Sequence, residues 1–195
     1  FVTTWYDQSG NANDAVQPAT TEQPKIVSAG ALVVGGLDFD GTDDYLITSS
    51  PIAAPQPFTF IHVSNPDTTA TGPIAAQAAT VFTNTEWADF YRSTGFVAIN
   101  AGTSAVGDSY AINTDYINFS LFNGASSEVS LNGSNVAGLS AGTTGGTQKL
   151  LIGRWELGAS FAFNGTISEA ILYASDQSAN RVGIEANINA AYSIY

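Results

Sequence analysis

Residues 36–48, GLDFDGTDDYLIT, decide the fold of this chain because two strand-forming runs there flank a polar turn. Aspartate and glycine favour such turns, since aspartate accepts hydrogen bonds from nearby backbone amides and glycine tolerates positive φ. Two other stretches also join a strand-forming run to a polar turn: WYDQSGNANDA at residues 5–15 and FNGTISEAILY at residues 163–173. Similar motifs near both ends indicate that the termini belong to one β-structure.

Strand signals recur at short intervals between these motifs. Residues 58–63, FTFIHV, alternate between two sets of side chains as a strand does, and DYINFSLF, SEVSLNG and KLLIGRW follow. The dipeptides Asn123-Gly124 and Asn132-Gly133 are typical of tight hairpin turns. We therefore predict an all-β fold rather than alternating strands and helices.

Only the C-terminal region is predicted to be helical. Ser175 or Ser178 is placed to cap a helix, and apolar residues three and four positions apart follow over residues 182–192. Gly183 weakens this helix by about 1 kcal/mol relative to alanine. The helix is therefore expected to depend on docking against the sheet, as a closing element rather than a partner-binding one.

The order and character of the three motifs resemble the laminin-G-like, concanavalin A-like jelly roll, from Trp5 to about Tyr173. The tail RVGIEANINAAYSIY, residues 181–195, is similar to the closing helix of laminin-G-like domains in bacterial and phage surface proteins. The resemblance implies an antiparallel β-sandwich jelly roll with a short C-terminal helix, whose first and last strands lie side by side. We expect one domain over residues 1–195, as a segment of a longer protein, because the chain starts at Phe1 and lacks methionine.

The charge balance argues against several classes of function. Seventeen acidic residues face five basic ones, giving a net charge of −12, which repels phosphate backbones and argues against nucleic-acid binding. The charge also disfavours anionic membranes, and no apolar run reaches the ~18 residues of a membrane-spanning helix. The chain has no cysteine, which excludes disulfides and thiolate chemistry. Charged residues make up only 11% of the chain, a composition typical of extracellular and virion-surface β-domains.

Two polar segments raise the question of calcium binding. The acidic cluster Asp38, Asp40, Asp43 and Asp44 offers the oxygen ligands that calcium prefers. The same sequence is a strong turn whose side chains bond nearby amides, and the resemblance favours the turn, because FDGTDDYL recurs as a structural corner in laminin-G-like domains. Residues 7–13, DQSGNAN, present the same alternatives. We expect structural turns and no cofactor, with calcium as the less favoured alternative.

Catalysis is less favoured than binding. His62 is the only histidine, so a zinc site with several histidines is excluded and a structural role is preferred. Glycoside hydrolysis needs two carboxyl groups facing one sugar bond, and the candidate acids are Glu86, Asp89 and Glu156. Glu86 and Asp89 are three positions apart, so a regular strand presents them on opposite faces. The motif WYDQSGN also resembles the catalytic domain of family 54 arabinofuranosidases, but this similarity covers the scaffold alone.

One candidate sugar-binding group lies on a predicted strand. Trp87, Asp89 and Tyr91 alternate within TEWADFYRS, so a strand presents all three on one face. Aromatic rings stack on the C–H faces of sugars, while carboxylates bond sugar hydroxyls. The alternative is that these aromatic side chains belong to the core of the sandwich.

A second candidate group lies in the loop GRWELGAS, where Arg154, Trp155 and Glu156 are adjacent. This loop is polar and contains glycine, so Trp155 is a better candidate for a surface ligand contact than a tryptophan within a strand. Trp5 and Tyr6, in contrast, are expected to be core residues.

The sequence therefore favours a non-catalytic recognition or adhesion module on an extracellular or phage virion protein. The resemblance makes a cell-surface or extracellular glycan the expected ligand. The second hypothesis is a virion decoration or fibre domain that contacts neighbouring subunits, and the third is a polysaccharide-active glycoside hydrolase. Glycan binding without hydrolysis, regular self-assembly and sugar release would distinguish the three.

Overall fold

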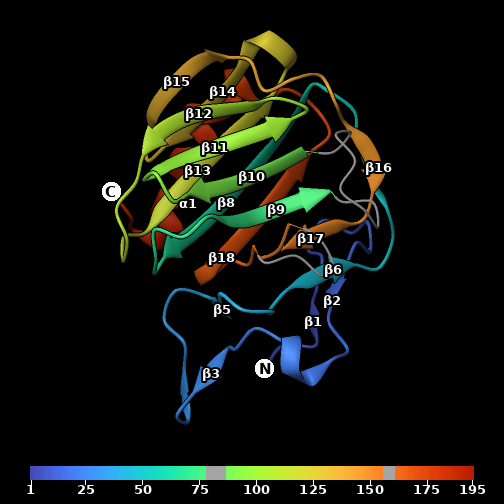
Figure 1. The fold of residues 1–195 in the computed structure, drawn as a ribbon, viewed down its shortest axis with the longest axis vertical. Coiled ribbons are helices and arrows are strands. Elements are labelled where there is room, and N and C mark those ends of the chain that lie inside the picture. The colour runs from blue at the N-terminus through green and yellow to red at the C-terminus, as the bar shows by residue number, and fades with distance from the viewer. Residues whose placement is uncertain (78–86, 156–160) are drawn as a thin grey trace.

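The computed structural model describes residues 1–77, 87–155 and 161–195, and its strands form two large antiparallel sheets (Figure 1). The eight-stranded sheet has the spatial order β1 (Thr4–Trp5), β2 (Ala15–Val16), β6 (Leu46–Thr48), β17 (Leu150–Ile152), β9 (Gly72–Gln77), β10 (Trp87–Arg92), β11 (Phe96–Ala101), β12 (Ser104–Ser109). The six-stranded sheet has the order β15 (Ser134–Leu139), β14 (Ser127–Leu131), β13 (Tyr116–Phe122), β8 (Phe58–Pro66), β18 (Asn164–Tyr173), β5 (Leu37–Asp40).

Smaller elements complete the structure. Two strand pairs lie outside the main sheets: β7 (Ile52–Ala54) with β16 (Gly146–Gln148), and β3 (Val27–Ser28) with β4 (Ala31–Leu32). Short 3-10 turns are η1 (Thr20–Glu22), η2 (Gly124–Ser126) and η3 (Ser178–Asn180), and the helix α1 spans Arg181–Tyr192. Within the described ranges α1 is the only α-helix, so the predicted all-β sandwich with a short C-terminal helix is confirmed. No helix in these ranges is long and apolar enough to cross a membrane.

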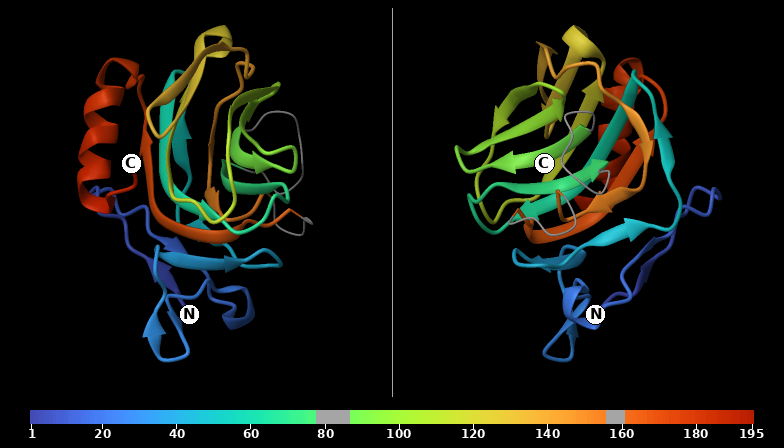
Figure 2. Two further views of the ribbon diagram at one scale, coloured as in Figure 1. Left: turned by 90° about the vertical axis from the view of Figure 1, so that its left-hand side faces the viewer. Right: turned by 45° about the vertical axis from the view of Figure 1, so that its right-hand side comes forward.

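The main core lies between the two sheets. Both sheets contribute fully buried aromatic rings to it, including Phe39, Phe58, Trp87 and Phe163. Figure 2 shows the sheets as two layers with α1 as a third layer outside the six-stranded sheet. Strand β8 is therefore buried on both faces, because its outer side chains, such as Ile61, pack toward α1.

Helix α1 is anchored by a small polar cluster within an apolar interface. Ile188 packs on the outer face of the six-stranded sheet. Glu185 is buried beside it, accepts a hydrogen bond from the Ser130 hydroxyl, and pairs with Arg181 at 2.9 Å. The helix begins after Asn180, with no side-chain cap from Ser175 or Ser178, because η3 occupies the turn before it.

The motifs at residues 36–48 and 163–173 meet through strand pairing, because β5 pairs with β18 from Asn164↔Asp40 to Ile167↔Leu37. Gly36 makes this approach possible. Its φ is +106°, and a Cβ there would lie 2.4 Å from the carbonyl oxygen of Ile167.

The expectation that the first and last strands lie side by side is wrong. β1 pairs with β2 at the edge of the eight-stranded sheet, whereas β18 lies between β8 and β5 in the other sheet. The reason is local: Thr4 and Trp5 pair with Val16 and Ala15 of the same N-terminal segment. The N-terminal segment and the last strand instead lie on two sides of a cleft.

Candidate functional site

The strand β10 presents Trp87, Asp89 and Tyr91 on one face, as their alternation predicted, but that face is the interior. All three side chains are 1% exposed. The indole ring of Trp87 packs against the rings of Phe58 and Phe122, with centroids 4.9 Å and 5.2 Å away. The expected sugar platform on this strand is therefore corrected to a part of the core, because sheet packing covers the face that carries these residues.

Asp89 and Tyr91 take part in a hydrogen-bonded cluster buried between the sheets. The hydroxyl of Ser64 lies 3.0 Å from both Nδ1 of His62 and the hydroxyl of Tyr91. The amide nitrogen of Asn118 lies 2.9 Å from Nε2 of His62 and donates to Oδ1 of Asp89 at 3.1 Å. Burial raises the pKa of Tyr91 well above its usual value. The cluster is closed to solvent, so these groups do not reach an external ligand.

Trp155 lies elsewhere, near the outer face of the eight-stranded sheet. It is half-buried, and its ring centroid lies 4.8 Å from that of Phe90 and 6.5 Å from that of Phe161. Phe90 faces outward because it sits between the inward-facing Asp89 and Tyr91. Trp155 and Phe161 thus form an aromatic patch with one exposed member, since Phe161 is exposed.

Arg154 connects this patch to the acidic loop after β5. Its guanidinium group lies 5.5 Å from the ring centre of Tyr45 and 3.5 Å from the carbonyl oxygen of Asp43. Glu156 and Glu86 lie outside the described residues.

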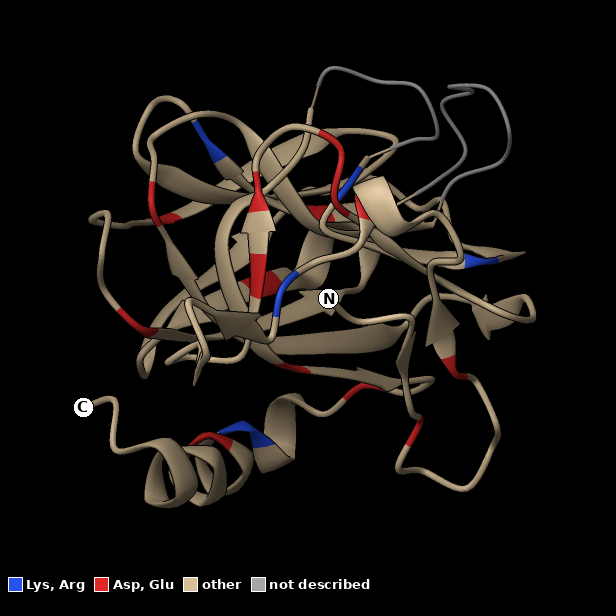
Figure 3. Ribbon diagram, turned by 90° about the horizontal axis from the view of Figure 1, so that it is seen from below, with Lys and Arg blue, Asp and Glu red and all other residues tan. Residues whose placement is uncertain are grey.

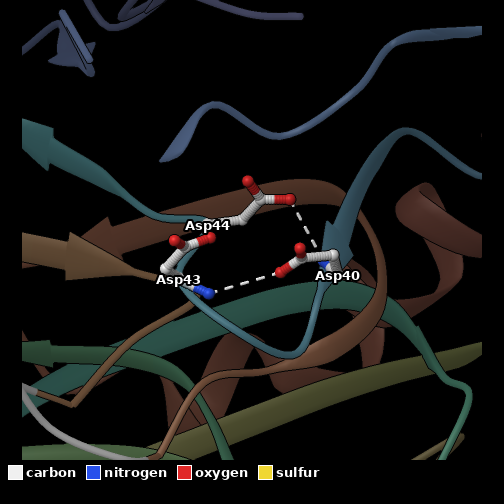
Figure 4. Close-up of side chains that lie close together, drawn as sticks. All are labelled: Asp40, Asp43 and Asp44. Carbon is white, nitrogen blue, oxygen red and sulfur yellow. Dashed lines mark hydrogen bonds between the residues drawn. The ribbon is translucent and has the colours of Figure 1, made fainter. Parts of the chain in front are cut away.

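The acidic loop is built around hydrogen bonds within a turn (Figure 4). Oδ1 of Asp40 accepts from the backbone amides of Thr42 and Asp43, at 2.8 and 3.3 Å, and Oδ2 of Asp44 accepts from the amide of Asp40. Asp38 lies apart from this group, in the backbone bridge to Lys25. These bonds are the ones that the turn interpretation predicts.

The loop also brings three carboxylates close together. One oxygen from each of Asp40, Asp43 and Asp44 lies within 4.8 Å of the others. Burial, and next the negative charge of Asp40, raises the pKa of Asp44 to about 6. The oxygen atoms are of the type that calcium prefers, and calcium stays the less favoured alternative to the structural turn.

A cleft with a volume of about 770 Å³ separates the N-terminal loop from strand β18. The loop contributes Trp5, Tyr6 and Asp7, and the opposite wall contains Glu169 and Tyr173. Further polar and aromatic residues that line it are Gln8, Ser9, Asn11, Asn13, Ser168 and Tyr192. The cleft exists because β5 pairs with β18 only as far as Ile167, which leaves the following residues of β18 to line its wall.

Hydrogen bonds within the loop hold its shape. The carboxylate of Asp7 accepts bonds from the amide of Ser9 at 2.7 Å, the hydroxyl of Ser9 at 2.8 Å and the amide of Asn13 at 2.9 Å. These bonds, that from Asn13 foremost, lower the pKa of Asp7, so this carboxylate stays charged at neutral pH. Of the two alternatives for residues 7–13, a structural turn or a calcium site, the hydrogen bonds of Asp7 are those of a turn.

The cleft contains residues that sequence reasoning assigned differently or missed. Tyr6 was expected in the core but is 66% exposed, because the loop carries its side chain away from the sandwich, whereas Trp5 is half-buried against the core. Glu169 and Tyr173 were not singled out. They alternate along β18 with Ala170 and Leu172, which pack inward. This alternation in the sequence indicates that Glu169 and Tyr173 face outward.

Comparisons with known proteins establish the fold. No protein-family model and no curated protein match the sequence. Among solved structures, the chain is similar to a heptameric SAP-like pentraxin from Limulus polyphemus, with a TM-score of 0.60, 15% identity and coverage of 78% of this chain and 82% of that one. It is also similar to Trypanosoma rangeli sialidase in complex with sialic acid, with a TM-score of 0.67, 16% identity and coverage of 94% and 30%.

The laminin comparison bears directly on the predicted resemblance. Domains LG4-5 of the mouse laminin alpha1 chain match with a TM-score of 0.59 and 11% identity, over 83% of this chain and 47% of that one. The laminin-G-like, concanavalin A-like fold is thus confirmed. This chain spans less than half of the laminin structure and less than a third of the sialidase. At these low sequence identities, the similarity shows a shared fold and nothing further.

Proposed function

We propose that this chain is a non-catalytic carbohydrate-binding module of an extracellular or virion protein, and that the cleft between the N-terminal loop and β18 binds the sugar. The observation that carries the proposal is the convergence of exposed or half-exposed aromatic rings with carboxylate and amide groups around one cleft. Tyr6 and Tyr173 lie on its opposite walls, while Asp7 and Glu169 add charged oxygens.

The chemistry of these side chains suits a sugar. Tyrosine and tryptophan rings offer apolar faces for the C–H groups of a pyranose, and their polar atoms bond hydroxyls. Amides such as Asn11 and Asn13 both donate and accept hydrogen bonds. The volume of about 770 Å³ falls within the roughly 300–1,000 Å³ that is usual for small-ligand sites, which is room for several sugar units.

Binding is better supported than hydrolysis. A general acid needs a carboxyl group whose pKa is raised toward the working pH, whereas the bonds from Asn13 and Ser9 lower the pKa of Asp7. Asp89, the strand acid considered for catalysis, is closed to solvent in the interior. Sugar release is therefore an outcome to measure but not one that we expect.

The direct test is a glycan array probed with the wild-type chain and two matched tyrosine variants. Tyr6→Ala removes an exposed ring of the cleft, and Tyr195→Ala removes one that is 55% exposed and does not line it. We expect glycan binding that Tyr6→Ala weakens and Tyr195→Ala preserves, with both variants folded by circular dichroism. Failure of the wild type to bind any glycan, or equal loss in both variants, would contradict the proposal.

The aromatic patch of Trp155 and Phe161 is a second candidate sugar contact within the same proposal. Arg154 and Glu156 are the neighbours of Trp155 in the sequence and were predicted to bind sugar with it. In the structure, Arg154 contacts Tyr45 and Asp43. Including Trp155→Ala in the array separates the two surfaces. Loss of binding in that variant, with Tyr6→Ala unaffected, would move the site to the patch.

One observation favours the subunit-contact hypothesis as a second candidate. The β3–β4 hairpin extends away from the sandwich (Figures 1 and 2). Aliphatic side chains are exposed on the hairpin and directly after it, with Leu32 74% and Val34 92% exposed. Exposed aliphatic clusters often mark protein contacts. Sedimentation of the wild type and of Leu32→Asp tests this function: assembly that the variant abolishes supports it, and a monomer at all concentrations argues against it.

A further inference from the structure

A second hollow lies next to the cleft, between β18 and helix α1. It has a volume of about 510 Å³ and is bounded on the helix side by Gly183, Ile184 and Asn187. Glu169, Ile171 and Tyr173 line both this hollow and the cleft. The two spaces therefore adjoin along the outward-facing residues of β18.

Helix α1 presents no side chain to the second hollow at Gly183. Gly183 has no neighbouring atom within 4 Å of the position that a Cβ would occupy, although glycine is a poor residue for a helix interior. A larger side chain would fit here without a clash and would fill space along the hollow. Gly183 thus keeps the hollow open at some cost to the helix.

The charged residues that line the two hollows are acidic. Asp7 and Glu169 supply carboxylates, and no lysine, arginine or histidine is found among the described residues that line either space. The chain as a whole has a net charge of −12, and Figure 3 shows acidic residues widely distributed with few basic ones among them. An anionic sugar entering these hollows would lose hydration without meeting a cation.

We propose that one elongated, uncharged oligosaccharide occupies both hollows, crossing β18 at Glu169, Ile171 and Tyr173. This inference rests on the proposed carbohydrate-binding function and adds the class of ligand: a neutral chain of several units, rather than a single sugar or a sialylated or sulfated glycan. The ring of Tyr173, which borders both spaces, provides the stacking surface at the crossing.

The test uses calorimetry with neutral oligosaccharides of two and six units from the glucan, xylan, mannan, galactan and chitin series. Sialyllactose and a heparin hexasaccharide serve as anionic probes. We expect at least one neutral series to bind, with the six-unit member about tenfold tighter or more than the two-unit member, and no binding of the anionic probes.

Two tryptophan substitutions on α1 locate the effect. Gly183→Trp places a ring at the second hollow, while Ala186→Trp places one at an exposed helix position that lines neither space. Gly183→Trp should remove the advantage of the six-unit sugar and leave two-unit binding unchanged, and Ala186→Trp should leave both unchanged. The melting temperature of Gly183→Trp should stay at or above that of the wild type, since tryptophan is a better helix residue than glycine.

The outcomes separate the inference from the function on which it rests. Binding that does not depend on sugar length, a length advantage that persists in Gly183→Trp, or a preference for an anionic probe would overturn the inference and keep the carbohydrate-binding function. Absence of binding by every sugar, on the array and in calorimetry, would overturn both.

Discussion

Nε2 of His62 lies 3.7 Å from Oδ1 of Asp89, although the two residues belong to opposite sheets, on β8 and β10. Neither side chain is open to solvent. The amide of Asn118, on β13, contacts both. A polar contact therefore joins the two layers within a core that otherwise consists of aromatic and aliphatic side chains.

The first prediction concerns this contact. Asp89→Ala should lower the free energy of unfolding by about 1–3 kcal/mol, because it leaves the buried amide of Asn118 without the acceptor that it has in the wild type. Urea denaturation followed by tryptophan fluorescence measures the change. Asp115→Ala is the control: this aspartate is exposed and its carboxylate bonds only the side chain of Asn65 among the described contacts, so its effect should stay within about 0.5 kcal/mol. Equal effects of the two substitutions would show that the cluster does not stabilise the fold.

The second prediction follows from the pKa of Asp44, which burial raises from 3.8 to about 6. Between these values the folded chain holds a proton that the unfolded chain has released, so the free energy of unfolding should fall as the pH rises from about 4 to 6. Asp44→Asn keeps an oxygen to accept from the Asp40 amide but removes the charge. The variant should therefore be more stable than the wild type above pH 6 and similar to it below pH 4, as thermal melts across this range will show.

The third prediction addresses calcium at the same loop. We expect calcium or a chelator to change the melting temperature little, because Asp40 and Asp44 already accept backbone hydrogen bonds. Differential scanning calorimetry with and without a millimolar excess of calcium tests this. A large increase in melting temperature that Asp40→Ala abolishes would instead identify a metal site.

The fourth prediction contrasts two tryptophans. Trp87→Ala should destabilise the chain by about 3–5 kcal/mol, because it empties a fully packed position, while Trp155→Ala should cost less, since Trp155 is half-buried against Phe90. Chemical denaturation of both variants provides the comparison. A larger loss for Trp155→Ala would mean that the patch on the outer sheet face is a structural core.

The fifth prediction concerns Gly36, where positive φ and close backbone approach coincide. Gly36→Ala should destabilise the fold by more than about 1 kcal/mol, because its Cβ would press against the backbone of Ile167 in β18. Gly95 has φ +81° but no atom within 4 Å of the position that a Cβ would occupy, so Gly95→Ala measures the cost of φ alone. If both substitutions cost the same, the approach of β18 is not what requires glycine at residue 36.

Local sequence determined the strands and turns of this protein. The motif at residues 36–48 became a strand, a turn and a second strand, and Asn132-Gly133 became a hairpin turn with φ of 49° and 81°. These features depend on neighbours along the chain: alternation of side chains, aspartates that bond adjacent amides, and residues that tolerate positive φ. The alternation also assigned Trp87, Asp89 and Tyr91 to one face correctly.

Only the tertiary structure decided which faces are open. Alternation states which residues share a face, but burial of that face depends on what packs over it, and the second sheet covers Trp87, Asp89 and Tyr91. Tertiary packing also places Tyr6 at a cleft. β5 stops pairing with β18 at Ile167, so the later residues of β18 and Tyr6 line one open space. Residues from the two ends of the chain line that cleft together, and no pattern within one segment encodes contacts between segments so far apart.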